Sequence, residues 1–366
     1  MSQLRVGIVG IGNISGIYLK NLGLYKSTTV VAVADIDKSR ADKAAQEHSV
    51  PFSLSPEELF AHPEVDLVLN LTIPAAHGPV ALQAVQAGKH VYNEKPLAVT
   101  VAQGKELNQL AADKGVRVGC APDTFLGSGI QTAREAIDSG LIGEPVAAQA
   151  FMLSRGPEGW HPSPEFFFKP GGGPMLDMGP YYLTALVNLL GPIRRTTGVS
   201  RASFRTRTVG SGPLKDSKIE VETPTHIVGG MEFAGGALGQ ITTSFDVYFG
   251  HEQPITIFGS EGTMLVPDPN NFQGDVQVRR HDHSEWETIA PRKNFASNSR
   301  GVGVLDIAVA LNERRTHRAN GELALHVLET MLSFSKASEE GRHQTIETQL
   351  VRPEALGVDE LASELP

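Results

Sequence analysis

The residues with the clearest chemical potential in this sequence are Lys95, with Glu94 directly before it, and Asp35. A lysine ammonium can donate a hydrogen bond to a hydroxyl group, or exchange a proton with it when burial or a neighbouring cation lowers its pKa. Asp35 lies about twenty residues after a turn that contains Gly10 and Gly12, the spacing at which dinucleotide-binding folds place their ribose-binding acid. Together these residues predict hydride-transfer chemistry with a nicotinamide nucleotide.

The segments before these residues have the pattern of buried strands. A short apolar run comes directly before the turn, before the acid and before the Glu94-Lys95 pair: residues 4–9, 29–34 and 90–92. Ligands of doubly wound folds bind outside the carboxyl ends of parallel strands. We therefore expect the turn, the acid and the lysine to face one ligand.

The glycine-rich turn has the composition of a pyrophosphate-binding loop. Gly10 and Gly12 would form a tight turn that lets backbone amides and the amino end of the next helix meet the phosphates. Asn13 and Ile14 belong to the same predicted cofactor site, and Ser15 stands where many such turns have a third glycine or an alanine. The alternative is an ordinary strand-to-helix turn.

Asp35 bears on the choice between the two nicotinamide dinucleotides. Its carboxylate is expected to accept hydrogen bonds from both ribose hydroxyls of NAD, and the residues that follow, Ile36 and Asp37, offer no arginine for a 2′-phosphate. The sequence therefore predicts NAD rather than NADP. The alternative for Asp35 is a turn aspartate at the end of a strand.

The composition is that of a globular protein. The chain of 366 residues, 40% hydrophobic and 20% charged, is long enough for two domains with separate cores. Its net charge of −9 argues against nucleic acid or an anionic membrane as a partner. We find no leader pattern and no apolar run long enough to span a bilayer. The chain has a single cysteine, Cys120, which we expect to be a buried strand thiol. These features predict a cytoplasmic protein.

The chain divides into two regions with different patterns. Residues 1–122 alternate strand and helix signals, which predicts an α/β Rossmann domain with a doubly wound parallel sheet. Residues 123–366 continue with turn-punctuated strands, two of which flank residues 234–236 as a hairpin, and helical patterns return at 302–312 and 322–339. This region is predicted to be an α+β domain with a large, mostly antiparallel open sheet, for substrate binding and oligomerisation.

Three motifs in this order resemble the Gfo/Idh/MocA oxidoreductases, the relatives of glucose-fructose oxidoreductase and inositol dehydrogenase. They are the glycine turn, the triplet Glu94-Lys95-Pro96 and the segment Gly171–Gly179, and the resemblance extends over essentially the whole chain. It implies a Rossmann domain, a second domain with a large open sheet, NAD or NADP, and a sugar or polyol substrate. It also implies a homodimer or homotetramer assembled through that sheet.

The resemblance also implies roles for residues beside the cofactor. Thr72, Pro74 and His77, in the turn after the strand at residues 65–72, correspond to residues that line the nicotinamide side, and Glu94 to one that helps to hold it. His77 could instead pack at the start of a helix, and Glu94 could be a solvated loop acid.

The predicted catalytic residues are Lys95, Asp177 and Tyr181. Lys95 would act on the reacting oxygen, with a surface lysine as the alternative, and Asp177 would orient the substrate, with an N-cap of the apolar helix at 182–190 as the alternative. Many relatives carry a catalytic histidine where this chain has Tyr181, and glucose-fructose oxidoreductase resembles it in having a tyrosine there. Whether Lys95 or Tyr181 carries the proton stays open, and Tyr182 is a neighbouring candidate.

Three further residues are predicted substrate ligands. Trp160 would stack on a sugar and His161 would bond a hydroxyl, where relatives often show Trp-Arg, and Asp123 would reach the site from the domain junction. A packed loop aromatic is the alternative for Trp160. No metal is predicted, because His281-Asp282-His283 lies on an expected hairpin without another ligand cluster.

Two other functions are consistent with these motifs. One is a transhydrogenase like glucose-fructose oxidoreductase, with tightly held NADP, which Asp35 disfavours. The other is a non-catalytic cofactor-sensing regulator, which should lack the lysine of the triplet, whereas Lys95 is present.

Overall fold

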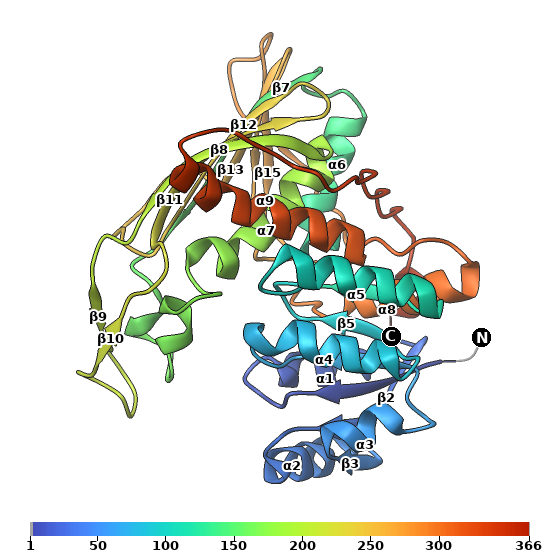
Figure 1. Cartoon of the computed structure of the whole chain (residues 1–366). Coiled ribbons are helices and arrows are strands. Elements are labelled where there is room, and N and C mark those ends of the chain that lie inside the picture. The colour runs from blue at the N-terminus through green and yellow to red at the C-terminus, as the bar shows by residue number, and fades with distance from the viewer. Residues whose placement is uncertain (1–2, 366) are drawn as a thin grey trace. The chain divides into compact units, whose positions relative to one another are not determined.

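The computed structural model describes residues 3–365 (Figure 1). Met1 and Ser2, at the start of the segment without a leader pattern, therefore lie outside the described residues. The chain forms two compact units. Among the described residues, unit 1 contains 3–126, Ser297–Leu325 and 356–365, and unit 2 contains Gly127–Ala296 and His326–Ala355.

Unit 1 is built on a six-stranded sheet in which every neighbouring pair is parallel, with the order β3-β2-β1-β4-β5-β6. This is the strand order of the Rossmann fold, as predicted. The strands are β1 Leu4–Val9, β2 Thr28–Ala34, β3 Phe52–Leu54, β4 Leu67–Asn70, β5 His90–Asn93 and β6 Val118–Cys120.

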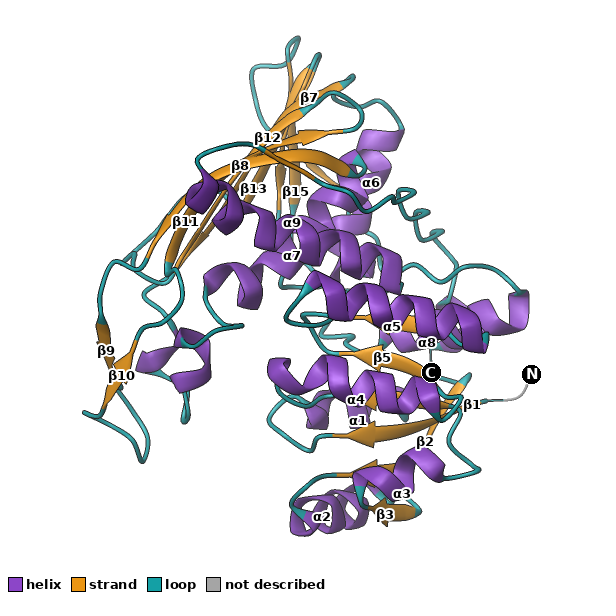
Figure 2. Ribbon diagram, in the orientation of Figure 1, coloured by secondary structure: helices purple, strands orange, loops and turns teal. Residues whose placement is uncertain are grey.

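The helices of unit 1 begin and end at residues with capping chemistry. Ser55 and Glu58 form the capping box expected from their spacing, and the Thr100 side chain accepts a hydrogen bond from the Gln103 amide. The helices are α1 Ser15–Leu22, α2 Lys38–His48, α3 Pro56–Ala61, α4 Pro74–Gln86, α5 Val101–Lys114 and α8 Val302–Glu313, with short 3-10 turns at Thr124–Leu126 and Ala362–Glu364. α4 and α5 lie side by side over the sheet (Figure 2).

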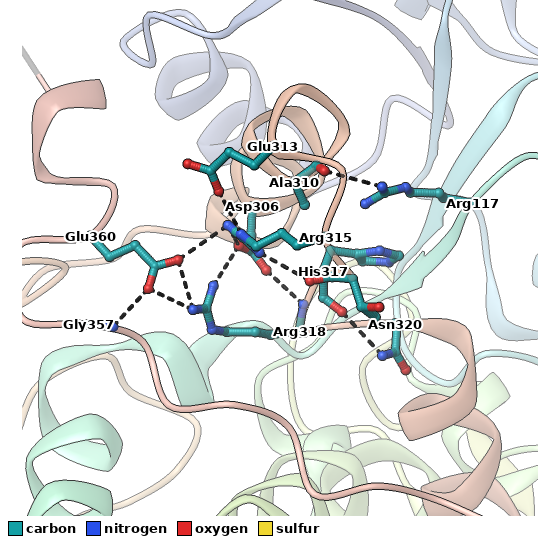
Figure 3. Close-up of polar contacts among 11 residues, drawn as sticks. Arg117, Asp306, Ala310, Glu313, Arg315, His317, Arg318, Asn320, Gly357 and Glu360 are labelled. Carbon is teal, nitrogen blue, oxygen red and sulfur yellow. Dashed lines mark hydrogen bonds and ion pairs between the residues drawn. The ribbon is translucent and has the colours of Figure 1, made fainter.

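Unit 1 includes carboxyl-terminal segments that the division at residue 122 assigned to the second domain. The reason is a buried ion-pair cluster around Asp306 of α8 (Figure 3). Asp306 pairs with Arg318 (2.8 Å) and Arg315 (2.7 Å), and Arg318 also bonds both carboxylate oxygens of Glu360. Because α8 packs against β6, this cluster attaches the end of the chain to the parallel-sheet unit.

Unit 2 is built on a nine-stranded mixed sheet with the order β16-β15-β14-β13-β7-β12-β11-β8-β17. Only β7 and β12 pair in parallel among these neighbours, which confirms the mostly antiparallel open sheet. The strands are β7 Pro145–Leu153, β8 Ile193–Arg201, β11 His226–Phe233, β12 Leu238–Ser244, β13 Ile255–Gly259, β14 Gly262–Val266, β15 Val276–Arg280, β16 Glu287–Ile289 and β17 Gln344–Thr345. β11 and β12 form the predicted hairpin.

Helices cover one face of this sheet: α6 Ser128–Asp138, α7 Pro174–Leu190 and the carboxyl-terminal part of α9 Gly321–Glu340 (Figure 2). α9 approaches closely because Gly198 and Gly229 pair across β8 and β11, and a side chain at Gly229 would clash with Phe334 (2.4 Å). A separate two-stranded sheet, β9 Thr206–Thr208 and β10 Lys218–Glu220, and 3-10 turns at Pro157–Gly159 and Glu165–Phe168 complete the unit.

α7 corrects one expectation. The predicted helix at 182–190 begins eight residues earlier, at Pro174, because a proline at the first helical position costs no hydrogen bond. Pro180 lies inside the helix and did not end it. Across residues 3–365, we find no helix with the length and apolar character to cross a membrane.

Candidate active site

The glycine turn leaves open space at the amino end of α1. Gly10 has a φ of +93°, and a side chain there would meet the backbone carbon of Leu71 at 2.7 Å, so the turn passes directly against the end of β4. A Cβ on Gly12 would meet no atom within 4 Å. Ile14, at the N-cap of α1, makes no side-chain cap, which leaves amides at the helix end for an anion.

Asp35 holds this turn and keeps capacity for a ligand. Its carboxylate accepts hydrogen bonds from the amides of Ile11 (2.7 Å) and Asp37 (2.9 Å). Each carboxylate oxygen has a further lone pair, so these bonds do not exhaust it. An open glycine, an uncapped helix end and this carboxylate stand at the carboxyl ends of β1 and β2, and this arrangement fits a dinucleotide.

Two exposed apolar side chains at the same edge of the sheet were missed by the sequence reasoning. Ile36, directly after Asp35, is 97% exposed, and Ile73, in the turn after β4, is 61% exposed. Burying such surface against a ligand is favourable. The available signal was an apolar residue placed directly after a strand end, where turn residues are usually polar.

Buried amides join the turns that follow β4 and β5. Asn70 donates to Asn93 (3.0 Å) and to the His77 carbonyl (3.1 Å), and it accepts a hydrogen bond from the Thr72 hydroxyl (2.6 Å). Asn93 donates to the Leu97 carbonyl (3.0 Å). Because both asparagines are fully buried, these bonds make the two turns one rigid element.

His77 connects the same two turns through its ring. Its Nδ1 lies 2.7 Å from the Pro96 carbonyl and its Nε2 lies 3.0 Å from the Thr72 carbonyl. The ring is 1% exposed, and burial lowers the pKa of His77. The His77 ring is therefore packed near the start of α4, which was the alternative to a place beside the cofactor. Pro74 is the first residue of this helix.

Glu94 and Lys95 lie in a largely buried polar environment at the end of β5. The Glu94 carboxylate accepts hydrogen bonds from the Tyr18 hydroxyl (2.8 Å) and the Lys95 amide (2.9 Å), so it is not a solvated loop acid. Lys95 is half-buried, and its ammonium acts electrostatically on His77 and Cys120. Burial raises the pKa of the Cys120 thiol, which keeps it protonated.

Asp123, a predicted substrate contact, bonds the start of a helix of its own unit. It is 2% exposed, and its Oδ2 accepts hydrogen bonds from the amides of Gly301 (2.8 Å) and Gly303 (3.0 Å) at the start of α8. Burial raises the pKa of Asp123 to about 6. The residue holds a helix end inside unit 1, a role that required knowing where residues 301–303 lie.

In unit 2, Asp177 and Tyr181 lie one turn apart on α7. Gly173 is the N-cap of this helix, so Asp177 stands in its first turn and is not the N-cap. Tyr181 is 8% exposed. Burial, together with the charge of Asp268, raises the pKa of Tyr182.

Trp160 and His161 lie on the loop that follows β7. Trp160 is 70% exposed, whereas the His161 ring makes edge-on contacts with Phe166 (5.5 Å between ring centres) and Phe167 (5.2 Å). Burial lowers the pKa of His161, and the charge of Asp177 acts in the opposite direction. His161 and Asp177, two residues that the sequence predicts for the substrate site, both belong to unit 2.

Nothing in residues 3–365 resembles a metal centre, since no three His, Cys, Asp or Glu side chains gather as ligands there. In the segment His281-Asp282-His283, the Nδ1 of His283 lies 2.8 Å from a carboxylate oxygen of Glu287.

Comparison with known families agrees with this geometry. Residues 4–121 match the model of an oxidoreductase family with an NAD-binding Rossmann fold, and residues 130–265 match that of the GFO/IDH/MocA C-terminal domain. The protein is an NAD-binding oxidoreductase. The chain belongs to the Gfo/Idh/MocA family, as its three motifs indicated.

Similar proteins include enzymes of cyclic polyols and sugars. The myo-inositol 2-dehydrogenase of Thermotoga maritima is 25% identical over 72% of this chain and 75% of its own length. The 1,5-anhydro-D-fructose reductase of Ensifer adhaerens is 28% identical over 94% of this chain and 99% of its own.

Solved structures share the fold along almost the whole chain. An NAD-binding oxidoreductase from Klebsiella pneumoniae superposes with a TM-score of 0.83 at 24% identity, over 95% of this chain and 100% of that chain. Levoglucosan dehydrogenase in complex with NADH and levoglucosan has a TM-score of 0.82 at 18% identity, with the same coverage of both chains.

Proposed function

We propose that this protein is an NAD-dependent dehydrogenase or reductase that acts on a CH–OH group of a sugar or cyclic polyol, or on the corresponding ketone. The observation that carries the proposal is Lys95 at the carboxyl end of β5, on the same sheet edge as the open glycine turn and Asp35. The names of the relatives, inositol dehydrogenases and an anhydrofructose reductase among them, support the substrate class.

Unit 1 would hold the cofactor. The turn from Gly10 to Ile14 would receive the pyrophosphate, and Asp35 would accept the ribose hydroxyls and repel a 2′-phosphate, so that NAD is preferred over NADP. Ile36 would cover an apolar face of the base. The nicotinamide ring, when bound, supplies the hydride acceptor for oxidation and the hydride donor for reduction.

The turns after β4 and β5 would set the nicotinamide end of this site. Thr72, Pro74 and Glu94 would lie along the nicotinamide. His77 would hold these residues in place, because its ring contacts the backbone of both turns. The hydrogen bonds of Glu94 to Tyr18 and to the Lys95 amide fix the backbone from which the Lys95 side chain extends.

The proton of the reacting hydroxyl would be exchanged with Lys95 or Tyr181. In oxidation, the O–H bond of the substrate breaks and its proton passes to the neutral amine of Lys95 or to the phenolate of Tyr181. In reduction, the resulting ammonium or phenol returns the proton to the oxygen. Asp177, one turn before Tyr181 on α7, would accept a hydrogen bond from a neighbouring hydroxyl and so orient the sugar ring. Trp160 would stack on the ring, and His161 would bond a hydroxyl.

A substrate screen tests this proposal. Purified protein is incubated with inositols, hexoses, pentoses and anhydrosugars, each with NAD and with NADP, and the absorbance of the reduced nicotinamide is followed. Turnover of at least one polyol or sugar with NAD supports the proposal. An absorbance band of bound nucleotide in the purified protein, without exchange for added NAD, would instead favour the transhydrogenase.

We also propose that copies of the chain associate through the open face of the unit 2 sheet. This face carries exposed apolar side chains on strands of the same sheet: Val199 (67% exposed), Val228 (40%) and Leu238 (57%). Val199 and Val228 are directly paired across β8 and β11. Light scattering tests this: Val199→Lys with Val228→Lys should shift a dimer or tetramer toward monomer, and a wild-type monomer contradicts the proposal.

A further inference from the structure

Arg207 of β9 is buried within unit 2 and bonded on every side. Its side chain is 1% exposed, its Nε donates to Glu158 (2.8 Å) and its Nη1 to Asp246 (2.6 Å). Its Nη2 donates to the carbonyls of Phe245 (2.9 Å) and Arg155, and also to Glu158. One guanidinium therefore joins segments that lie 49 and 39 residues from it in the sequence.

Two arginines face the two acids of this cluster, because Arg155 Nη1 also lies 3.7 Å from the Glu158 carboxylate. The side chains of Glu158 and Asp246 are 8% and 6% exposed, and removing the Arg207 cation would take from Asp246 its charged partner in this cluster. Asp246 is held in turn by the hydroxyl of Thr225 (2.6 Å). The guanidinium also stacks over the ring of Phe168, 5.3 Å from its centre.

These contacts converge on the loop that carries Trp160 and His161. Arg207 bonds the carbonyl of Arg155 and the side chain of Glu158, which lie at the start and in the middle of this loop. The Gly210 amide, beyond β9, donates to the Glu158 carbonyl (2.7 Å), and the amides of Trp160 (3.1 Å) and His161 (2.8 Å) both donate to Pro157. Trp160 itself stays largely exposed at the end of this network.

We propose that Arg207 is a positioning residue for substrate recognition, which holds the loop 155–161 so that Trp160 and His161 form a rigid wall of the sugar site. This rests on the proposed function, because it takes Trp160 as a substrate contact. A lysine cannot replace the guanidinium here, because its three N–H donors extend from one atom and cannot reach two carboxylates and two carbonyls together.

The experiment compares two buried arginines, each paired with two acids, that belong to different units. Arg207→Lys is made beside Arg318→Lys, since Arg318 is likewise buried (5% exposed) and paired with two acids, Asp306 and Glu360, within unit 1. We expect both variants to lower the Tm. Only Arg207→Lys should raise the KM for the sugar, by about tenfold, with kcat and the KM for NAD within about twofold of wild type.

A second readout follows the loop without turnover. The chain has two tryptophans, so in a Trp286→Phe background the fluorescence of Trp160 is observed alone. Arg207→Lys should lower its anisotropy, because the loop gains fast local motion, and Arg318→Lys should leave it unchanged. Glu158→Gln, which keeps the side-chain shape and an acceptor oxygen, should give the same changes more weakly. It replaces Arg207→Lys as the test variant if Arg207→Lys does not fold.

The outcomes separate the two proposals. If Trp160→Ala leaves the KM for the sugar unchanged, the proposed substrate wall is contradicted, whatever Arg207 does to the loop. If Trp160→Ala raises this KM but Arg207→Lys and Glu158→Gln change neither the KM nor the anisotropy, the positioning role is overturned. If no sugar or polyol is turned over, the anisotropy still decides whether Arg207 holds the loop.

Discussion

The two units hold their candidate site residues by different means. In unit 1 these residues stand on short turns directly after β1, β2, β4 and β5, and neighbouring strands bring the turns together. In unit 2 they stand on α7 and on the loop 155–161, which buried side chains from distant segments hold in place. Strand pairing therefore brings the turns of unit 1 together, and short-range bonds of Asn70, Asn93 and His77 fix two of them. In unit 2, side chains from distant segments hold the loop.

This difference has a consequence for substitution. A change at a strand-end residue of unit 1 should remove one chemical group and leave its neighbours in place, because the turns are attached to a paired sheet. A change at a buried anchor of unit 2 should displace residues that it never touches. The predictions below test this difference, from the largest expected effect to the smallest.

The largest effect is expected at Lys95 in unit 1. Lys95→Ala removes the ammonium from the end of β5, and kcat should fall by about a hundredfold or more, since general acid–base groups typically supply 10²–10⁴. The dissociation constant for NAD, measured by fluorescence titration, should change much less. Near-normal turnover of this variant would assign Lys95 a structural role.

A loss of about two orders of magnitude in kcat is expected for Tyr181→Phe in unit 2, if its hydroxyl carries the proton. The thermal stability should change little, because one oxygen is removed from a buried ring. The matched control is Tyr182→Phe, which should be much milder because its side chain is turned about 100° around α7 from that of Tyr181. The reverse order of effects would place the proton carrier at Tyr182, and two mild variants would leave Lys95 as the proton carrier.

A smaller effect, on cofactor choice, is expected at Asp35. Wild-type protein should prefer NAD over NADP in kcat/KM by at least about tenfold, since the carboxylate repels a 2′-phosphate. Asp35→Ser should narrow this preference. Equal kcat/KM values for NAD and NADP in the wild-type protein would contradict the assignment.

The smallest effect on activity is expected at Asp123, which acts on stability. Its pKa is raised from 3.8 to about 6 in the folded protein, so folding favours the protonated form. The corresponding stability is present below pH 4 and is lost as the pH rises through 6, by about 3 kcal/mol for a shift of two pKa units. Asp123→Asn should remove this part of the pH dependence.

Urea unfolding of the Asp123→Asn and wild-type proteins between pH 4 and 7 measures the difference. A wild-type protein whose stability relative to Asp123→Asn does not fall over this range would contradict a raised pKa. The KM for the sugar should be unchanged in Asp123→Asn, because the side chain bonds the start of α8. A raised KM would restore the predicted substrate contact.

Local chemistry made much of this protein predictable. The strand, glycine turn and acid of the first βαβ unit, the capping box at Ser55 and the hairpin at residues 234–236 each depend on residues that are close in the sequence. The family motifs added the second domain and the oxidoreductase class, which the family matches confirm. Lys95 was recognisable as a candidate because its strand and its triplet are contiguous.

Other features depended on residues that meet only in the folded chain. The sequence alone determined the Rossmann sheet, the mixed sheet and the residue types of the candidate site. The tertiary structure decided that α8 and the end of the chain join unit 1, that Asp123 holds α8, and that Arg207 anchors the loop of Trp160. The physical reason is that a buried charge takes its role from its partners, and those of Asp123 and Arg207 lie 39 to 180 residues away along the chain.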